Sequence, residues 1–469
     1  MRLAARFIAV ALVVAGCEPD ETRDPTPEVP FAHYASGTRL RARVLDGGDG
    51  AVKLVGWRDT GLDVDCEMRA TNAGVRCVPL ESRDNYFADP ECTEPIHFGA
   101  VPDSGLALTA VDGLCGAESE WHVWRIDETE LGPDTVYGRS DAGDCVADET
   151  VDPSVPRYRL VDATAELVPM TTTTTALGAL EVVFAVGDDG SRAVISLVDH
   201  ATGVRCVEAG GPTIANGVDV CVPFDSTYVA DGYYASPDCS GESRGAFTCD
   251  ATPCPTPGLG VFTQTTDCES EVTLLSLGAQ QSSYGLANGV CEEVVFGPCV
   301  FFPATATLDP RSFPALQHLP IGEGRLQVDT LTPEGSEDIL AFGGFIDTNA
   351  GAPCVPVDID GATRCVPSPV SVNPGFTWYS DPSCSKPVAP TSSVDPCAAA
   401  PTVALHYDQP DGLIITEAPV DAAYSVTTRT TTATYAFVGD ACVMQGPQDV
   451  LLLAPLDPST LAPLSTRIE

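Results

Sequence analysis

The chain has 469 residues, of which 24 are basic and 66 acidic, so its formal net charge is −42. A surface of this charge repels phosphate backbones, which argues against a nucleic-acid partner. Apolar residues make up 44% of the chain, enough for real cores, and a chain of this length should divide into several domains or repeats.

Residues 1–17 have the pattern of an export signal. Two arginines precede an apolar run over residues 7–15 that is too short to span a bilayer. Its ending, Val-Ala-Gly before Cys17, resembles the bacterial lipobox, which implies a lipoprotein signal peptide over 1–16 and lipidation of Cys17. We therefore expect a protein of the cell envelope that is anchored by lipid to the outer membrane and faces the periplasm or the cell surface.

An acidic, proline-rich segment follows over residues 17–35. Such a composition buries too little apolar surface to fold, so the segment should stay extended. We expect it to be a linker that holds the rest of the chain away from the membrane.

Five landmarks then occur three times in the same order, which is the pattern of a tandem repeat. In each copy an aspartate follows an apolar segment, and four cysteines come after it at similar spacings. The aspartates are Asp59, Asp199 and Asp347. The cysteines are Cys66, Cys77, Cys92 and Cys145, then Cys206, Cys221, Cys239 and Cys291, then Cys354, Cys365, Cys384 and Cys442. This predicts three repeats of about 145 residues, which we call module 1 (36–176), module 2 (177–320) and module 3 (321–469).

Local sequence patterns predict strands almost throughout each module, so the expected fold class is all-β. Apolar and β-branched stretches alternate with turn signals such as Asp46-Gly-Gly-Asp-Gly50 and Gly187-Asp-Asp-Gly190, which are typical of hairpin loops. Roughly eight short strands per module would build either a six-bladed, propeller-like body or a tandem of separate β-sandwich domains. The short connections between modules favour the single continuous body.

An exported protein with this many cysteines should form disulfides rather than metal-thiolate sites. Equivalent positions in the modules predict the pairs Cys66–Cys77, Cys206–Cys221 and Cys354–Cys365. Short loops close most easily, which predicts the further pairs Cys92–Cys115, Cys384–Cys397, and Cys239 with either Cys249 or Cys254. Cys145 and Cys442 then remain without a local partner. If the modules close on one another as a ring, these two cysteines should form a disulfide.

The opening of module 1 combines several motifs, namely Ser36–Gly50, Val55-Gly-Trp-Arg-Asp59, Cys77-Val-Pro79 and the element from Tyr86 to Cys92. This combination resembles a set of cysteine-rich predicted lipoproteins from Gram-negative, soil-type bacteria. The resemblance covers most of residues 36–150 and recurs more loosely afterwards. It implies a lipid-anchored, exported β protein. No activity, ligand or catalytic residue is known for that set, so the resemblance implies none of these.

The motifs that suggest chemistry also have structural explanations. Gly241-Glu-Ser-Arg-Gly245 fits the pattern of a hydrolase nucleophile elbow, but that elbow needs a helix after it, and a polar loop is expected here. The histidines share no ligand spacing and no repeat position, so we expect them to pack at the surface or half-buried. They are His33, His97, His122, His200, His318 and His406. We therefore predict no catalytic residue and no metal ligand.

Calcium is the one cofactor that the composition suggests. The candidate carboxylates are the turn pairs Asp46/Asp49, Asp188/Asp189 and Asp358/Asp360. None of the pairs completes a calcium loop of the hand type. Hairpin turns also need Asp and Gly for their own backbone geometry, which is the better explanation of these residues. The aromatic pair before the third cysteine of each module is expected to pack in a core rather than to stack on a ligand.

The sequence thus favours a non-enzymatic envelope lipoprotein that acts as a binding or structural module for an unknown protein or glycan ligand. The alternative is an exported hydrolase that acts on glycans or peptides with carboxylates on its loops. Carboxylate pairs cannot be recognised from sequence, because their separation in space is what matters. A pocket that holds paired carboxylates would favour the enzyme.

Overall fold

The computed structural model describes a large part of the chain. The described residues are 33–81, 86–111, 119–131, 135–139, 144–148, 152, 154–209, 219–223, 227–248, 258–266, 269–287, 289–295, 299–367, 370–372, 378–391, 402–407, 420–438 and 441–469. The predicted lipidation site Cys17 lies outside them, as do Cys115, Cys249, Cys254 and Cys397.

Within the described residues the fold is nearly all β, as the sequence predicts. The first group of elements is β1 (Tyr34–Ala35), β2 (Leu40–Asp46), β3 (Val52–Asp59), β4 (Val64–Thr71), β5 (Gly74–Pro79), β6 (Tyr86–Phe87), β7 (Pro95–Phe98), β8 (Leu106–Val111), β9 (Glu120–Glu130), β10 (Tyr137–Arg139), β11 (Cys145–Ala147), β12 (Arg157–Asp162), the 3-10 helix η2 (Thr164–Glu166) and β13 (Met170–Leu177).

The second group is β14 (Leu180–Gly187), β15 (Arg192–Asp199), β16 (Val204–Ala209), β17 (Asp219–Pro223), β18 (Thr227–Asp231), β19 (Tyr233–Tyr234), β20 (Arg244–Thr248), β21 (Leu259–Thr266), β22 (Glu269–Leu277), β23 (Ser283–Ala287), β24 (Val290–Val294), β25 (Val300–Thr307), η3 (Pro310–Ser312) and β26 (Ala315–Ile321). The third group is β27 (Leu326–Pro333), β28 (Ala341–Asp347), β29 (Ala352–Ile359), β30 (Ala362–Pro367), β31 (Val370–Val372), β32 (Trp378–Tyr379), β33 (Pro387–Pro390), β34 (Val403–Tyr407), β35 (Val420–Val438), β36 (Ala441–Pro455), η6 (Pro458–Thr460), β37 (Ala462–Pro463) and β38 (Ser465–Ile468).

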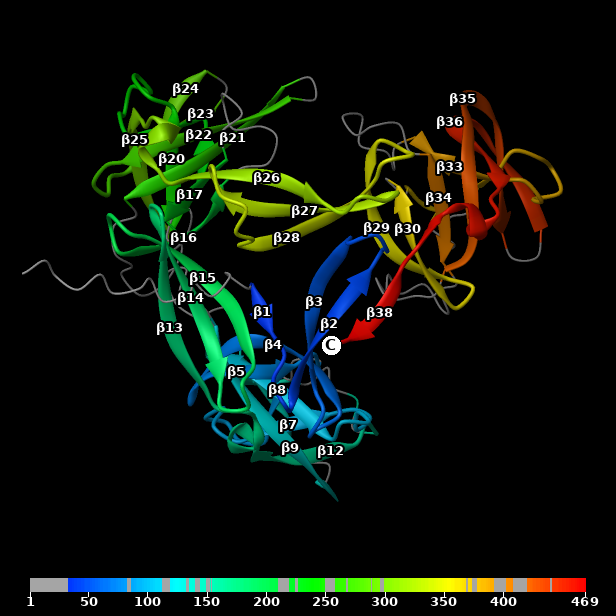
Figure 1. The fold of residues 1–469 in the computed structure, drawn as a ribbon. Helices are drawn as coiled ribbons and strands as arrows, with labels where there is room; N and C mark the ends of the chain where they lie inside the picture. Colours follow the sequence, from blue (N-terminus) through cyan, green and yellow to red (C-terminus); the bar gives the residue numbers. More distant parts are fainter. Residues whose placement is uncertain are drawn as a thin grey trace, which may run out of the picture.

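The three modules form a closed ring, which Figure 1 shows as a triangle. Each side of the triangle contains three antiparallel strands of a larger sheet, where the last strand of one module pairs with the first hairpin of the next. The sides are β13 with β14 and β15, β26 with β27 and β28, and β38 with β2 and β3. Strand β38 at the C-terminus thus completes the first hairpin of module 1. The first and last modules are therefore neighbours, as a ring requires.

A six-bladed propeller is not confirmed. The described strands form an 18-stranded sheet, a 12-stranded sheet, a closed barrel of β18, β20, β25, β22 and β21, and a small sheet of β19, β23 and β24. The later strands of each module lie at the corners of the triangle, as the labels β7 to β12, β20 to β25 and β33 to β36 in Figure 1 show.

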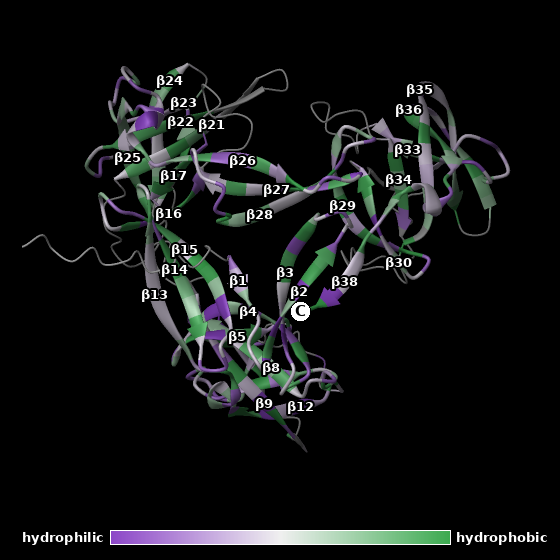
Figure 2. Ribbon diagram, in the orientation of Figure 1, coloured by the Kyte–Doolittle hydropathy of each residue, from purple (hydrophilic) through white to green (hydrophobic). Residues whose placement is uncertain are grey.

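A buried core joins each module to its neighbour, and we call these three cores seams. Seam 1/2 contains Leu40, Trp57, Cys66, Cys77, Met170 and Ala185. Seam 2/3 contains Leu180, Phe184, Cys206, Cys221, Leu316 and Leu331. Seam 3/1 contains Leu45, Leu326, Phe345, Cys354, Cys365 and Leu464. Apolar stretches are visible along the strands of the sides in Figure 2. Because each seam buries side chains from two modules, the hydrophobic effect stabilises the ring as a whole.

The landmark aspartates Asp59, Asp199 and Asp347 are buried, and each fixes the turn after its strand. Their carboxylates accept hydrogen bonds from backbone N–H groups two or three residues further along the chain. Aspartate is well suited to this role because its short side chain reaches the turn backbone. The landmark thus marks the tight turn that precedes the first cysteine strand.

The three disulfides predicted from equivalent positions are present. They are Cys66–Cys77, Cys206–Cys221 and Cys354–Cys365, each with a Cα–Cα distance of 5.3 Å. Each disulfide joins two neighbouring strands of one sheet and contributes both sulfurs to a seam.

The pairs predicted from short loops are wrong, and so is the predicted Cys145–Cys442 disulfide between modules. Cys92 is bonded to Cys145, Cys239 to Cys291 and Cys384 to Cys442. The predicted pairs Cys92–Cys115, Cys384–Cys397, and Cys239 with Cys249 or Cys254 are therefore excluded.

Strand pairing explains the correction. In every module the short aromatic strand before the third cysteine (β6, β19 or β32) pairs with a later strand that carries Tyr137, Tyr284 or Tyr435 (β10, β23 or β35). This pairing brings together cysteines that are 53, 52 and 58 residues apart. The entropy cost of closing a loop grows only slowly with its length, so sequence proximity is a poor guide once a sheet supplies the register.

Candidate functional site

The described chain begins at the centre of the ring, where β1 lies beside β15 (Figure 1). Tyr34 pairs with Ala193 of module 2, and its hydroxyl donates a hydrogen bond to Oε2 of Glu469 at 3.0 Å. The Tyr34 ring also packs edge-on to Trp57 of module 1, with 6.4 Å between the ring centroids. We call residues 33–35 the hub strand, because they contact elements of all three modules.

His33 makes further contacts of the hub strand with module 3. Its Nδ1 lies 3.2 Å from the carbonyl oxygen of Ile339, and its ring packs edge-on to Phe342 at 5.0 Å. Burial lowers the pKa of His33 to about 4, although the backbone hydrogen bond opposes this. His33 is therefore neutral at physiological pH and acts as a half-buried polar anchor.

A cavity of about 380 Å³ opens beside the hub strand. Its lining comes from all three modules and includes Leu54, Ile195, Arg205, Glu208 and Phe342. The lining is mostly apolar, with Arg205 and Glu208 as its charged residues. We call it the hub cavity. Its size and its few polar groups are typical of a pocket that holds a small molecule or one group of a larger ligand.

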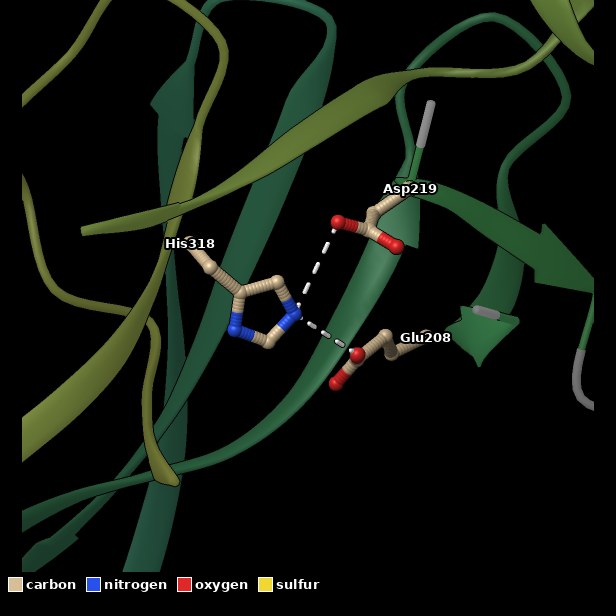
Figure 3. A group of neighbouring side chains, drawn as sticks. All are labelled: Glu208, Asp219 and His318. Carbon is tan, nitrogen blue, oxygen red and sulfur yellow. Dashed lines mark hydrogen bonds and ion pairs between the residues drawn. The ribbon is translucent and has the colours of Figure 1, made fainter. Parts of the chain in front are cut away.

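A cluster of charged side chains lies at the end of seam 2/3 (Figure 3). Nε2 of His318 on β26 is 3.1 Å from Oε1 of Glu208 on β16 and 3.6 Å from Oδ2 of Asp219 on β17. The other ring nitrogen, Nδ1, is 2.7 Å from Oδ2 of Asp329 on β27. Four adjacent strands thus place three carboxylates around one imidazole.

The strand period explains why these four side chains meet. Glu208 follows Cys206, Asp219 precedes Cys221, His318 follows Leu316 and Asp329 precedes Leu331, each by two residues. Side chains two apart on a strand point to the same face. The four charged side chains therefore lie on the same strand faces as the apolar side chains of seam 2/3, next to the end of that core.

The electrostatics of this cluster favour a cation. Burial opposes a positive charge on His318, but hydrogen bonds and charges from Asp329 and Glu208 outweigh it and hold the pKa of His318 above its ordinary value. One potential ligand atom each from Glu208, Asp219 and His318 lies within 4.8 Å of the others. These three residues could hold a metal ion. They are about a third exposed or less, so solvent and small ions reach them.

The calcium candidates of the sequence have other partners. Asp46 pairs with Arg467 at 2.9 Å, Asp189 accepts from the backbone N–H of Leu40, and Asp358 accepts from a threonine hydroxyl. Among the described residues, none of the six turn aspartates belongs to a group of three potential metal ligands. Asp46 and Asp189 thus join modules, and Asp358 fixes a hairpin.

The remaining motifs also have structural roles. Ser243 of the Gly-x-Ser-x-Gly sequence donates to Oδ1 of Asp231 at 2.7 Å, and strand β20 follows it instead of a helix. The nucleophile elbow is therefore not formed. One ring of each aromatic pair packs against a neighbouring ring, with Tyr86–Phe98, Tyr233–Phe247 and Tyr379–Phe437 centroids 5.2, 4.9 and 5.6 Å apart. The pairs are half-buried and belong to no buried core, so the predicted core packing is not confirmed.

Sequence reasoning missed His318, for which it predicted simple packing. His122 follows that prediction, since it is half-buried and stacks on Trp124. His97 does not, because it is fully buried near the carbonyl of Ala100. A partial signal was present, because Glu208 and Asp219 each lie two residues from a repeat cysteine. His318 is near no landmark, so only the pairing of β17 with β26 reveals the cluster.

Comparison with known proteins found no match to this chain among family models, curated proteins or solved structures. The disulfides indicate an oxidising environment outside the cytoplasm. None of the helices formed by the described residues has the length and apolar character needed to cross a membrane.

Proposed function

We propose that the protein is a lipid-anchored binding protein of the cell envelope, and that its ligand binds in the hub cavity. The export signal and the lipobox pattern at Cys17 support lipid attachment. The hub cavity is the observation that carries the proposal, because all three modules line it next to the hub strand. The last residues of the predicted 17–35 linker, 33–35, form that strand instead of staying unfolded, so the anchor would hold the ring at its centre.

The lining of the cavity indicates what the ligand presents. A volume of about 380 Å³ accepts an aromatic side chain or a sugar ring with its substituents. Leu54, Ile195 and Phe342 would cover the apolar face of such a group, while Arg205 and Glu208 would orient its polar atoms. A segment of a partner protein or a glycan from the envelope fits this description.

A fluorescent probe tests the cavity. 1-Anilinonaphthalene-8-sulfonate combines fused aromatic rings with an anionic group, so we expect one saturable site on the full chain. The variants Ala341→Leu and Ser196→Leu add side-chain volume at two lining positions and should each weaken this binding. Val295→Ser, at an exposed residue away from the cavity, is the matched control and should leave binding unchanged. Equal binding by all four proteins would contradict the proposal.

The anchor has its own test. Cells that express the protein and are grown with labelled palmitate should incorporate the label, and the protein should fractionate with the outer membrane. The variant Cys17→Ser should lose both properties. Label that persists in Cys17→Ser would show that the lipid is not attached at Cys17.

One observation favours the alternative function, an exported hydrolase that acts on glycans or peptides. Glu208 both lines the hub cavity and lies beside Asp219 and His318, so a carboxylate pair and an imidazole adjoin a pocket. The hydrolase would be supported if the wild type released product from peptidoglycan fragments or casein peptides and the variant Glu208→Gln did not. An inactive wild-type protein that binds the probe would support the binding module.

A further inference from the structure

The charged cluster of seam 2/3 has a counterpart at each of the other two seams, and the strand register identifies the matching positions. His318 is opposite Leu331 in β26 and β27, Thr172 is opposite Ala185 in β13 and β14, and Thr466 is opposite Leu45 in β38 and β2. In each case the opposite residue belongs to the buried core of the seam. The position of His318 is therefore threonine at both other seams.

The two carboxylates have counterparts by the same reasoning. Glu208 is opposite Cys221, Met68 is opposite Cys77 and Pro356 is opposite Cys365. Asp219, Val75 and Thr363 each stand two residues before the same cysteines. The set Glu, Asp and His at seam 2/3 thus corresponds to Met, Val and Thr at seam 1/2 and to Pro, Thr and Thr at seam 3/1.

The comparison shows that the charged cluster of seam 2/3 is not needed for the ring to fold. At seam 1/2, Met68 and Val75 pack half-buried against the core, so a seam closes well with apolar residues at these positions. Placing three carboxylates around one imidazole adds repulsion between like charges. Seam 1/2 closes without that cost, so the cluster is an addition of seam 2/3 whose negative charge a bound cation would offset.

We infer that Glu208, Asp219 and His318 bind a divalent transition-metal ion of the zinc class. Zinc binds imidazole nitrogen and carboxylate oxygen at about 2.0–2.2 Å, so its tetrahedral ligands lie about 3.4 Å apart. The separations of 3.1 and 3.6 Å between Nε2 and the two carboxylate oxygens bracket that value. An imidazole ligand favours zinc over magnesium or calcium, which prefer oxygen ligands.

Asp329 supplies the supporting contact that such a site needs. Its carboxylate lies 2.7 Å from Nδ1 of His318, so it would hold the imidazole proton on Nδ1 when a metal ion replaces the proton on Nε2. The ion would have three protein ligands and an open position for water, and its charge would offset the surrounding carboxylates. This inference does not depend on the ligand of the hub cavity.

The test is metal binding by the full chain after treatment with a chelator. Calorimetric titration with zinc should show one tight equivalent, and cobalt at the same site should give visible absorption bands. His318→Thr introduces the residue that both other seams carry, so it should fold normally and bind zinc at least tenfold more weakly. Glu208→Met introduces the residue of seam 1/2 and should have the same effect. Asp329→Ala should weaken binding by roughly 10- to 100-fold, because it removes the contact that orients the imidazole.

His200→Thr is the matched control. Nδ1 of His200 pairs with the single carboxylate of Glu181 at 2.9 Å on an exposed surface, so its loss should leave the tight equivalent unchanged. The inference is overturned if zinc binds His318→Thr and Glu208→Met as tightly as the wild type. It is equally overturned if the wild type binds zinc only in many weak equivalents, as an acidic surface would. Should one variant fail to fold, the other decides.

Discussion

At the scale of single residues, the landmark aspartates differ in one instructive way. Arg39 holds Asp59, and Arg325 holds Asp347, each through at least two hydrogen bonds between the guanidinium and the carboxylate. Each arginine also donates to a backbone carbonyl of a 3-10 helix. Arg39 donates to Glu166 in η2, and Arg325 donates to Thr460 in η6. The matching position of module 2 is Ala179, so among the described residues the Asp199 carboxylate accepts hydrogen bonds only from its turn and from the Thr202 hydroxyl.

This difference gives a matched pair of variants. Asp347→Ala leaves the partly buried Arg325 without its partner and should lower the free energy of unfolding by about 3 kcal/mol. Asp199→Ala removes turn hydrogen bonds only and should cost about 1 kcal/mol. Urea denaturation followed by circular dichroism measures both. Equal losses in the two variants would show that the arginines contribute nothing.

The acid limit of stability also depends on single carboxylates. Burial raises the pKa of Asp189, but hydrogen bonds from Ser191, Leu40 and Arg39 outweigh it and hold the pKa below the ordinary value of 3.8. A carboxyl group whose pKa is lower in the folded state stabilises the fold above the ordinary value, and this stability is lost as the pH falls through the folded pKa. Asp189 joins the turn of module 2 to the start of module 1.

We therefore expect the urea midpoint to decrease as the pH falls below about 4. Asp189→Asn should cost about 1–3 kcal/mol at pH 7, because the N–H groups of Leu40 and Arg39 lose a charged acceptor. The variant should also show a shallower decrease in stability on acidification. Curves for variant and wild type that stay parallel from pH 7 to pH 2 would contradict this role.

At the scale of the elements, the second set of disulfides gives the clearest prediction. Each bond fastens the turn after an aromatic strand to a strand about fifty residues further along the chain. Peptide mapping under non-reducing conditions should recover Cys92 with Cys145, Cys239 with Cys291 and Cys384 with Cys442. Fragments that join Cys145 to Cys442, or Cys92 to Cys115, would refute the strand register of β6 with β10.

The elements also show what could be predicted from the sequence and why. Turns, strand character and the Cys66–Cys77 type of disulfide depend on neighbouring residues, so local patterns predict them. The second disulfides and the cluster at His318 depend on the register between distant strands. Glu208 and His318 are 110 residues apart, and no periodicity in either segment indicates that β17 will pair with β26.

At the scale of the whole molecule, closure depends on strands that are exchanged between neighbouring modules. β13 and β26 leave their own modules to complete the first hairpin of the next one, and β38 does the same across the ends of the chain. The sequence predicted one continuous body from the short connections between modules, and the Cys145–Cys442 disulfide that it expected of a ring does not form. Strand pairing and the buried seams provide the closure instead.

Hydrogen exchange in β38 tests this closure most directly. Four residues of this strand pair with β2, from Arg43 with Ile468 to Asp46 with Ser465, and the backbone N–H of Glu469 donates to the carbonyl of Ala42 at 3.0 Å. A chain end held in this way opens only when the ring opens, so its amides should exchange as slowly as those of β2. Measured by mass spectrometry on the full chain, the C-terminal peptide should show that protection. Complete exchange of residues 465–469 within seconds, with β2 still protected, would show that the ring is not closed.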